Sequence, residues 1–89
     1  MGMNRPITLT VTHLRYLKEA AYLPESLARI VREASQTGDQ ALLIMPGETA
    51  EEFRSAFTER LAEVGFDAGY GLTDEGRLLE DLIDRFDPD

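Results

Sequence analysis

The chain has 89 residues, of which 43% are apolar, contains no cysteine, and carries a net charge of −8 at pH 7. A chain of this length predicts one small globular domain over residues 1–89, stabilised by its core. Without cysteine it can form neither a disulfide framework nor the usual thiolate zinc site. No secretory pattern and no run of 18 apolar residues occurs, so we expect a cytoplasmic protein without membrane contact.

The charge is divided unevenly along the chain. Residues 1–35 hold five bases and three acids, a balance of +2, whereas residues 36–89 hold fourteen acids and four arginines, a balance of −10. Nucleic-acid binding depends on Lys and Arg side chains that neutralise phosphates. The acidic second part would therefore repel a nucleic acid and attract a basic protein.

The spacing of apolar residues changes from a strand-like period to a helical one near the start of the chain. Residues 7–12 alternate apolar residues with Thr, which favours a strand, but a helical stripe already begins at Val11, so this segment is either a strand or a helix start. Thr10 or Thr12 is the candidate N-cap. Pro24 ends or bends this helix and is also suited to start the next one. A polar break follows at 35–39, where Gly38 suits the left-handed position after a helix.

The middle of the chain predicts a strand and a long helix. The unbroken apolar run at 41–45 is typical of a strand covered on both faces. Thr49 and Glu52 fit a capping box for a helix over about 50–64. Its inward residues are Ala50, Phe53, Phe57, Leu61 and Val64, and those expected to point mostly outward are Glu51, Glu52, Arg54, Glu59 and Arg60. Gly65 ends it, and if Gly65 takes the left-handed conformation, Phe66 would contact Leu61 across the turn.

The last part alternates apolar residues over 66–72, including Tyr70, which predicts a third strand despite its glycines. Thr73 then caps a helix whose first turn is acidic and whose last turn carries Arg85, matching the helix dipole. Its buried residues are Leu78, Leu79, Leu82, Ile83 and Phe86. We therefore expect an α+β fold with a small three-stranded sheet and four amphipathic helices, in the order strand, helix, helix, strand, helix, strand, helix. The two strands at 41–72 would form a right-handed parallel crossover if they share a sheet.

No residue pattern indicates catalysis or a cofactor. His13 is the only histidine and is read as a surface or helix-start residue. The glycines at 69–76 lack the spacing of a nucleotide loop, and acids stand where a phosphate would bind. The segment from Asp67 also lacks the oxygen ligands of a calcium loop. We expect no enzyme activity, no cofactor and no metal site.

Carboxylates gather on the last helix, at Glu80, Asp81, Asp84 and Asp87, with Asp89 beyond them. Most of this pattern is typical of a solvated helix face with pairing at spacing four, as for Asp81 and Arg85. The same carboxylates are the candidate contacts for a basic partner, because complementary charge raises association rates.

Two resemblances concern the C-terminal part. Residues 70–79 (YGLTDEGRLL) resemble the stretch that follows the wing in winged-helix regulators of the MarR and PadR type, which implies a β-hairpin wing and a basic groove. The longer pattern from Gly65 to Phe86 is similar to the C-terminal signature of small, uncharacterised bacterial acidic proteins, and that resemblance implies no activity.

The preferred function is a small acidic protein-binding module, comparable to an antitoxin, an immunity protein or a regulatory accessory protein, with self-association also open. A winged-helix-like, transcription-associated protein is the alternative. The helix at 50–64, where a recognition helix would lie, carries four Glu against two Arg, so nucleic-acid binding is not expected.

Overall fold

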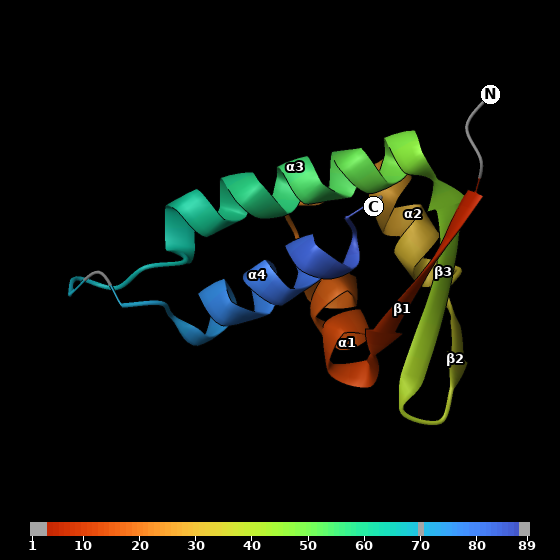
Figure 1. The fold of residues 1–89 in the computed structure, drawn as a ribbon, viewed down its shortest axis with the longest axis horizontal. Helices are drawn as coiled ribbons and strands as arrows, with labels where there is room; N and C mark the ends of the chain where they lie inside the picture. Colours follow the sequence, from red (N-terminus) through yellow and green to blue (C-terminus); the bar gives the residue numbers. More distant parts are fainter. Residues whose placement is uncertain (1–3, 70, 88–89) are drawn as a thin grey trace.

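The computed structural model describes residues 4–69 and 71–87. They form β1 (Asn4–Thr10), α1 (Val11–Glu19), α2 (Glu25–Arg32), β2 (Ser35–Thr37), β3 (Gln40–Pro46), α3 (Gly47–Val64) and α4 (Asp74–Arg85). The strands make one antiparallel sheet in the order β1-β3-β2, and the helices lie to one side of it (Figure 1). The α+β class, with three strands and four helices, is confirmed.

The order of the elements differs from the expected one, because segment 66–72 is not a strand. It turns back on itself, with an isolated bridge between Phe66 and Leu72 and a backbone hydrogen bond from the Asp67 N–H to the Gly71 carbonyl oxygen at 2.9 Å. The Asp67 carboxylate accepts hydrogen bonds from the backbone N–H groups of Gly69 and Gly71, each at 2.9 Å, and this local turn replaces an extended strand. Tyr70 lies outside the described residues. The parallel crossover is therefore wrong.

The third strand is instead β2, in the segment expected to be a polar break. Thr37 pairs with Gln40, so β2 and β3 form a hairpin with a two-residue loop at Gly38 and Asp39. Gly38 has φ 60°, as expected, but it turns a hairpin and does not end a helix. A Gly-Asp loop between strands is a common hairpin signal, although the polar strand beside it hid the pattern here.

β3 is covered on one face only, which corrects the expectation for 41–45. Ala41, Leu43 and Met45 are each at most 2% exposed, whereas Leu42 and Ile44 are 40% and 59% exposed. The helices lie on one side of the sheet, so alternate residues of an unbroken apolar run point to solvent. Composition alone does not distinguish the two cases.

The start of α1 is resolved as a strand followed directly by a helix. Thr10 is the N-cap, and its hydroxyl accepts a hydrogen bond from the His13 N–H at 3.2 Å, while the His13 ring accepts one from the Thr10 N–H. α1 ends before the loop that contains Pro24, and Pro24 is the residue preceding α2. His13 is a helix-start residue, as expected, but it is only 5% exposed.

α3 begins at Gly47, three residues before the expected start, and no side chain caps it. The capping box of Thr49 and Glu52 is therefore wrong, because Pro46 already directs the chain into the helix. Gly65 ends α3 as expected, but with φ −74° it does not take the left-handed conformation. Its role is close packing: a Cβ on Gly76 of α4 would lie 2.4 Å from the Gly65 carbonyl oxygen. The two helices meet at this glycine pair.

The core lies between the inner face of the sheet and the helices. Phe53 and Phe57 of α3 and Phe86 after α4 are fully buried, with ring centroids 4.9–5.9 Å apart. The inward faces expected for α3 and α4 are confirmed in their buried or partly buried residues. Among the described helices, none is long and apolar enough to cross a membrane.

Candidate functional site

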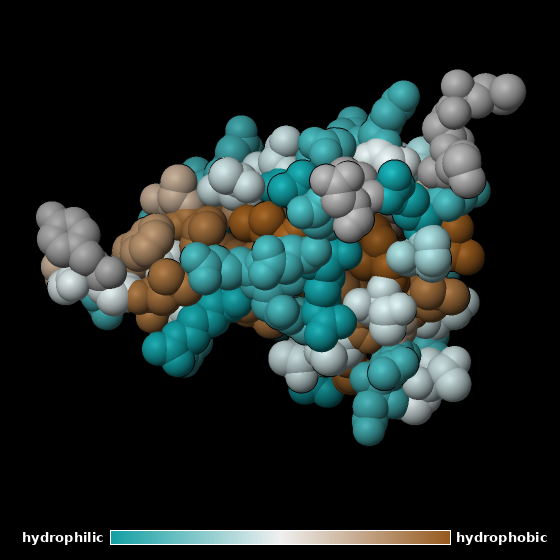
Figure 2. All heavy atoms as spheres, in the orientation of Figure 1, coloured by the Kyte–Doolittle hydropathy of each residue, from teal (hydrophilic) through white to brown (hydrophobic). Residues whose placement is uncertain are grey.

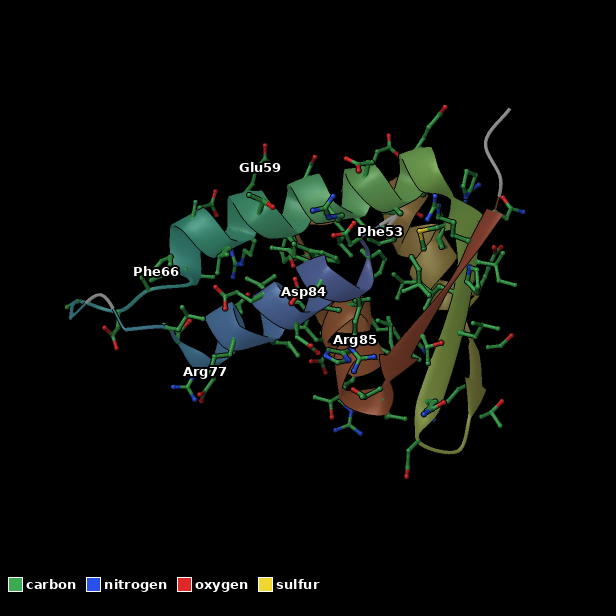
Figure 3. All side chains as sticks on the ribbon, viewed as in Figure 1. Phe53, Glu59, Phe66, Arg77, Asp84 and Arg85 are labelled. Atoms are coloured by element: carbon green, nitrogen blue, oxygen red, sulfur yellow. The ribbon has the colours of Figure 1, made fainter. Side chains whose placement is uncertain are left out.

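The carboxylates expected to bind a partner do not form one uniform surface. Glu80 and Asp84 are exposed on α4 and Asp87 is exposed just beyond it, and Figure 3 labels Asp84 on α4. Asp81, in contrast, contacts His13 Nε2 at 2.6 Å and Arg85 Nε at 3.1 Å. The expected pairing of Asp81 with Arg85 is thus present, and Asp81 serves the fold.

The contacts of His13 resemble a catalytic triad, but they fix the ring in place. Thr10 Oγ1 lies 2.8 Å from Nδ1, and Asp81 lies at Nε2. Because Nδ1 accepts from the Thr10 N–H, the proton of the neutral ring stands on Nε2 and is donated to Asp81. Burial lowers the pKa of His13, against the opposing attraction of Asp81. Both ring nitrogens are engaged and the residue is only 5% exposed, so these contacts hold the ring in place.

A second polar cluster joins α1, α3 and α4. The Tyr16 hydroxyl donates to Glu75 Oε2 at 2.7 Å, the Tyr22 hydroxyl lies 2.8 Å from that of Tyr16, and Arg60 Nε donates to the same Glu75 oxygen at 3.0 Å. The Arg60 guanidinium also lies 5.2 Å from the centre of the Tyr22 ring, in cation–π range. This Tyr-Arg-Glu cluster holds Arg60 at one end of a surface groove.

The protonation states of this cluster follow from its contacts. Burial raises the pKa of Tyr16, and its hydrogen bonds to Tyr22 and Glu75 act in the same direction. Burial also raises the pKa of Tyr22. Burial would raise the pKa of Glu75, but hydrogen bonds from Arg60 and Tyr16 outweigh it and lower that pKa. Glu75 is therefore an anion at neutral pH, and it neutralises Arg60.

The groove lies between the start of α2 and the middle of α3, with a volume of about 390 Å³. We call it the α2–α3 groove. Its lining residues are Tyr22, Pro24, Ser26, Leu27, Glu52, Ser55, Ala56, Glu59, Arg60 and Glu63. Apolar surface from Tyr22, Pro24, Leu27 and Ala56 is thus bordered by three carboxylates, and Figure 3 shows Glu59 pointing away from the body of the molecule.

The charge of the groove is negative after internal pairing is considered. Arg60 forms an ion pair with Glu75 and a longer one with Glu63, at 3.8 Å. Among the ion pairs found in residues 4–69 and 71–87, none involves Glu52 or Glu59. These two carboxylates remain open to a cation from outside. The helical period of the sequence predicts both side chains on the outer face of α3. Nothing in the sequence predicts that α2 packs beside them and makes the groove.

The described residues contain no candidate metal centre, because no group of three or more His, Asp or Glu side chains among them is placed to hold a metal ion. Searches of protein-family models, curated proteins and solved structures find no match to this chain. The function must therefore be argued from the surface itself.

Proposed function

We propose that this protein is a small protein-binding module and that the α2–α3 groove binds a basic segment of a partner protein. The observation that carries the proposal is the combination in one groove of an apolar floor with two unpaired carboxylates, Glu52 and Glu59. An apolar surface supplies affinity through burial, and the charges supply orientation and rate. The antitoxin, immunity and regulatory proteins considered above are classes of this kind.

The spacing of the carboxylates defines the partner's chemistry. Glu52 and Glu59 are seven residues apart on one helix, which corresponds to about 10 Å at 1.5 Å per residue. Two basic residues at spacing three in an extended polyproline II segment point to the same side and lie about 9 Å apart, nearly the same distance. An apolar side chain between them would lie over Leu27 and Ala56. The favoured ligand is therefore an extended segment with two Lys or Arg residues that flank an apolar residue.

The experiment uses defined peptides and then the natural partner. Peptides with Arg residues at spacing three around a Leu should bind the labelled protein, and binding should weaken strongly between about 50 and 500 mM salt. The Glu52→Gln/Glu59→Gln double variant should lose at least about tenfold in affinity, since it removes both open charges. The matched control is Glu48→Gln, which removes an exposed charge of α3 that does not line the groove.

The natural partner can be identified by cross-linking. The chain has no cysteine, so Ser55→Cys in the groove accepts a single photoactivated cross-linker. A basic protein cross-linked in native lysate, and lost in the Glu52→Gln/Glu59→Gln background, supports the proposal. Cross-linking that is equal in both backgrounds, or an acidic partner, contradicts it.

One observation favours the winged-helix alternative as a second candidate. The helix pair α1 and α2 is followed directly by the β2–β3 hairpin, an arrangement in which a hairpin could act as a wing. This is not the place that the resemblance at 70–79 implied. The charges of α2 and of the hairpin argue against phosphate contact, because Arg32 is bound to Glu25 at 2.6 Å and Asp39 lies at the hairpin tip. Salt-sensitive binding of duplex DNA that Arg29→Ala weakens would favour this candidate.

A further inference from the structure

The outer face of the sheet, on the side opposite the helices, carries no ionisable residue. By the strand register it consists of Asn4, Pro6, Thr8 and Thr10 of β1, Gln40, Leu42, Ile44 and Pro46 of β3, and Ser35 and Thr37 of β2. The whole chain is 29% charged residues, so about three charges would be expected among ten residues. We call this surface the neutral sheet face.

The centre of the neutral sheet face is apolar and exposed. Leu42 and Ile44 are 40% and 59% exposed, and they lie opposite Thr8 and Pro6 of β1. Figure 2 shows hydrophobic residues reaching the surface at the sheet side of the molecule. Large apolar side chains that stand next to each other on a pleated surface are typical of an association site.

Addition of a strand to the β1 edge is hindered, and the other edge strand, β2, has only three residues, so the face is the larger contact surface. Pro6 has no N–H to donate, and the Thr8 carbonyl oxygen already accepts from the Arg85 guanidinium at 2.8 Å. The Thr10 N–H is bound by His13 Nδ1. An edge with its donors and acceptors occupied in this way resists strand-to-strand pairing.

The charge of the molecule indicates which partner covers this face. A basic partner gains nothing from an uncharged surface, and it would meet carboxylates on α3 and α4 instead. A second copy of this chain carries −8 and is repelled wherever acidic helices approach each other. The neutral sheet face lets two copies meet without bringing two like charges into contact, so a second copy is the occupant that it fits.

We propose that two copies of the protein pack sheet to sheet through the neutral sheet face, with Leu42 and Ile44 at the centre. Sheets that pack in this way lie about 10 Å apart and are related here by a two-fold axis. Seven residues of β1 and β3 extend over about 23 Å, and three strands over about 14 Å, so the contact is small. It corresponds to a weak dimer with a dissociation constant of about 10 μM or above.

Sedimentation equilibrium tests the proposal. The mass of the wild type should rise from 10.0 kDa towards twice that value as its concentration increases from about 5 μM to about 1 mM. Ile44→Asp should weaken the dimer at least about 100-fold, because the two-fold axis places two charges at the centre. The matched control is Phe66→Asp, which adds the same charge at a side chain 51% exposed and outside the sheet, and which should dimerise like the wild type.

A second measurement locates the contact. Ser35→Cys on the neutral sheet face should form dimers with a short bis-maleimide, whereas Thr58→Cys on the exposed side of α3 should not; the chain has no other cysteine. Circular dichroism of each variant verifies that it is folded. A wild type that stays at 10.0 kDa at the highest concentration, a folded Ile44→Asp that associates equally well, or cross-linking through Thr58→Cys alone would each overturn the proposal.

Discussion

The sign of the pH dependence contributed by His13 follows from its contacts. Protonation would place a hydrogen on Nδ1, where the Thr10 N–H already points at 3.2 Å. Burial and the nearby Arg85 oppose the imidazolium, and Asp81 favours it; the balance lowers the pKa of His13 from its ordinary value of 6.5. The folded state therefore binds fewer protons than the unfolded state at mildly acidic pH. This contribution to stability is complete above pH 6.5 and is lost as the pH falls through the folded pKa.

The change in the free energy of unfolding with pH is limited to the effect of one proton. Since His13 is the only histidine, it is the only side chain with an ordinary pKa between pH 5.5 and 7.5. Acidification from pH 7.5 to pH 5.5 therefore lowers the free energy of unfolding by at most about 1.4 kcal/mol through this group, and the loss is smaller when the pKa is lowered less.

Urea unfolding at the two pH values measures this loss. The wild type should lose stability on acidification, and His13→Gln, which cannot titrate but can still hydrogen-bond at the helix start, should not. Asp81→Asn removes the attraction that favours the imidazolium, so its loss should be at least as large as that of the wild type. If the wild type is equally stable or more stable at pH 5.5, the Asp81 ion pair dominates, and the assignment of a neutral His13 fails.

Two further substitutions test the packing and the polar cluster. Gly76→Ala should destabilise the protein by about 1–3 kcal/mol in urea unfolding, because the added methyl group meets the backbone of Gly65 and α4 must shift; wild-type stability would show that the helices do not meet there. Tyr16→Phe should cost about 1 kcal/mol, since the Tyr22 hydroxyl and Glu75 each lose a hydrogen bond. If the same variant loses a tyrosine that titrates near the ordinary pKa of about 10 in an absorbance titration, the raised pKa of Tyr16 is contradicted.

Much of the helical structure could be predicted from local patterns. The apolar stripe of α3, with Phe53 and Phe57, and the cap at Thr73, which accepts from the Gly76 N–H at 2.9 Å, depend on residues close in sequence. The strands were harder to predict. Segment 66–72 has the alternation of a strand, but the Asp67 carboxylate closes a local turn there. The three polar residues of β2 have no strand pattern and pair only because the Gly38 turn folds them onto β3.

The candidate sites depended on long-range packing and were predicted least well. Glu59 was placed on the outer face of its helix, but only the approach of α2 makes it the border of a groove. Ile44 was expected in the core, because an apolar run does not reveal that one face of its sheet lacks a cover. Asp81 was counted among partner contacts, although His13, 68 positions away in the sequence, binds it internally. Each error concerns which distant segment lies beside a residue.

The aromatic cluster has a consequence for the order in which the protein folds. All three strands lie within residues 4–46, so the sheet can pair early, whereas the rings that fill its core come from Phe53, Phe57 and Phe86. A chain that emerges from the ribosome acquires the third ring 29 residues after the second. Until then the apolar faces of α3 and the sheet lack one of the rings that cover them, so the core closes only after α4 has been made.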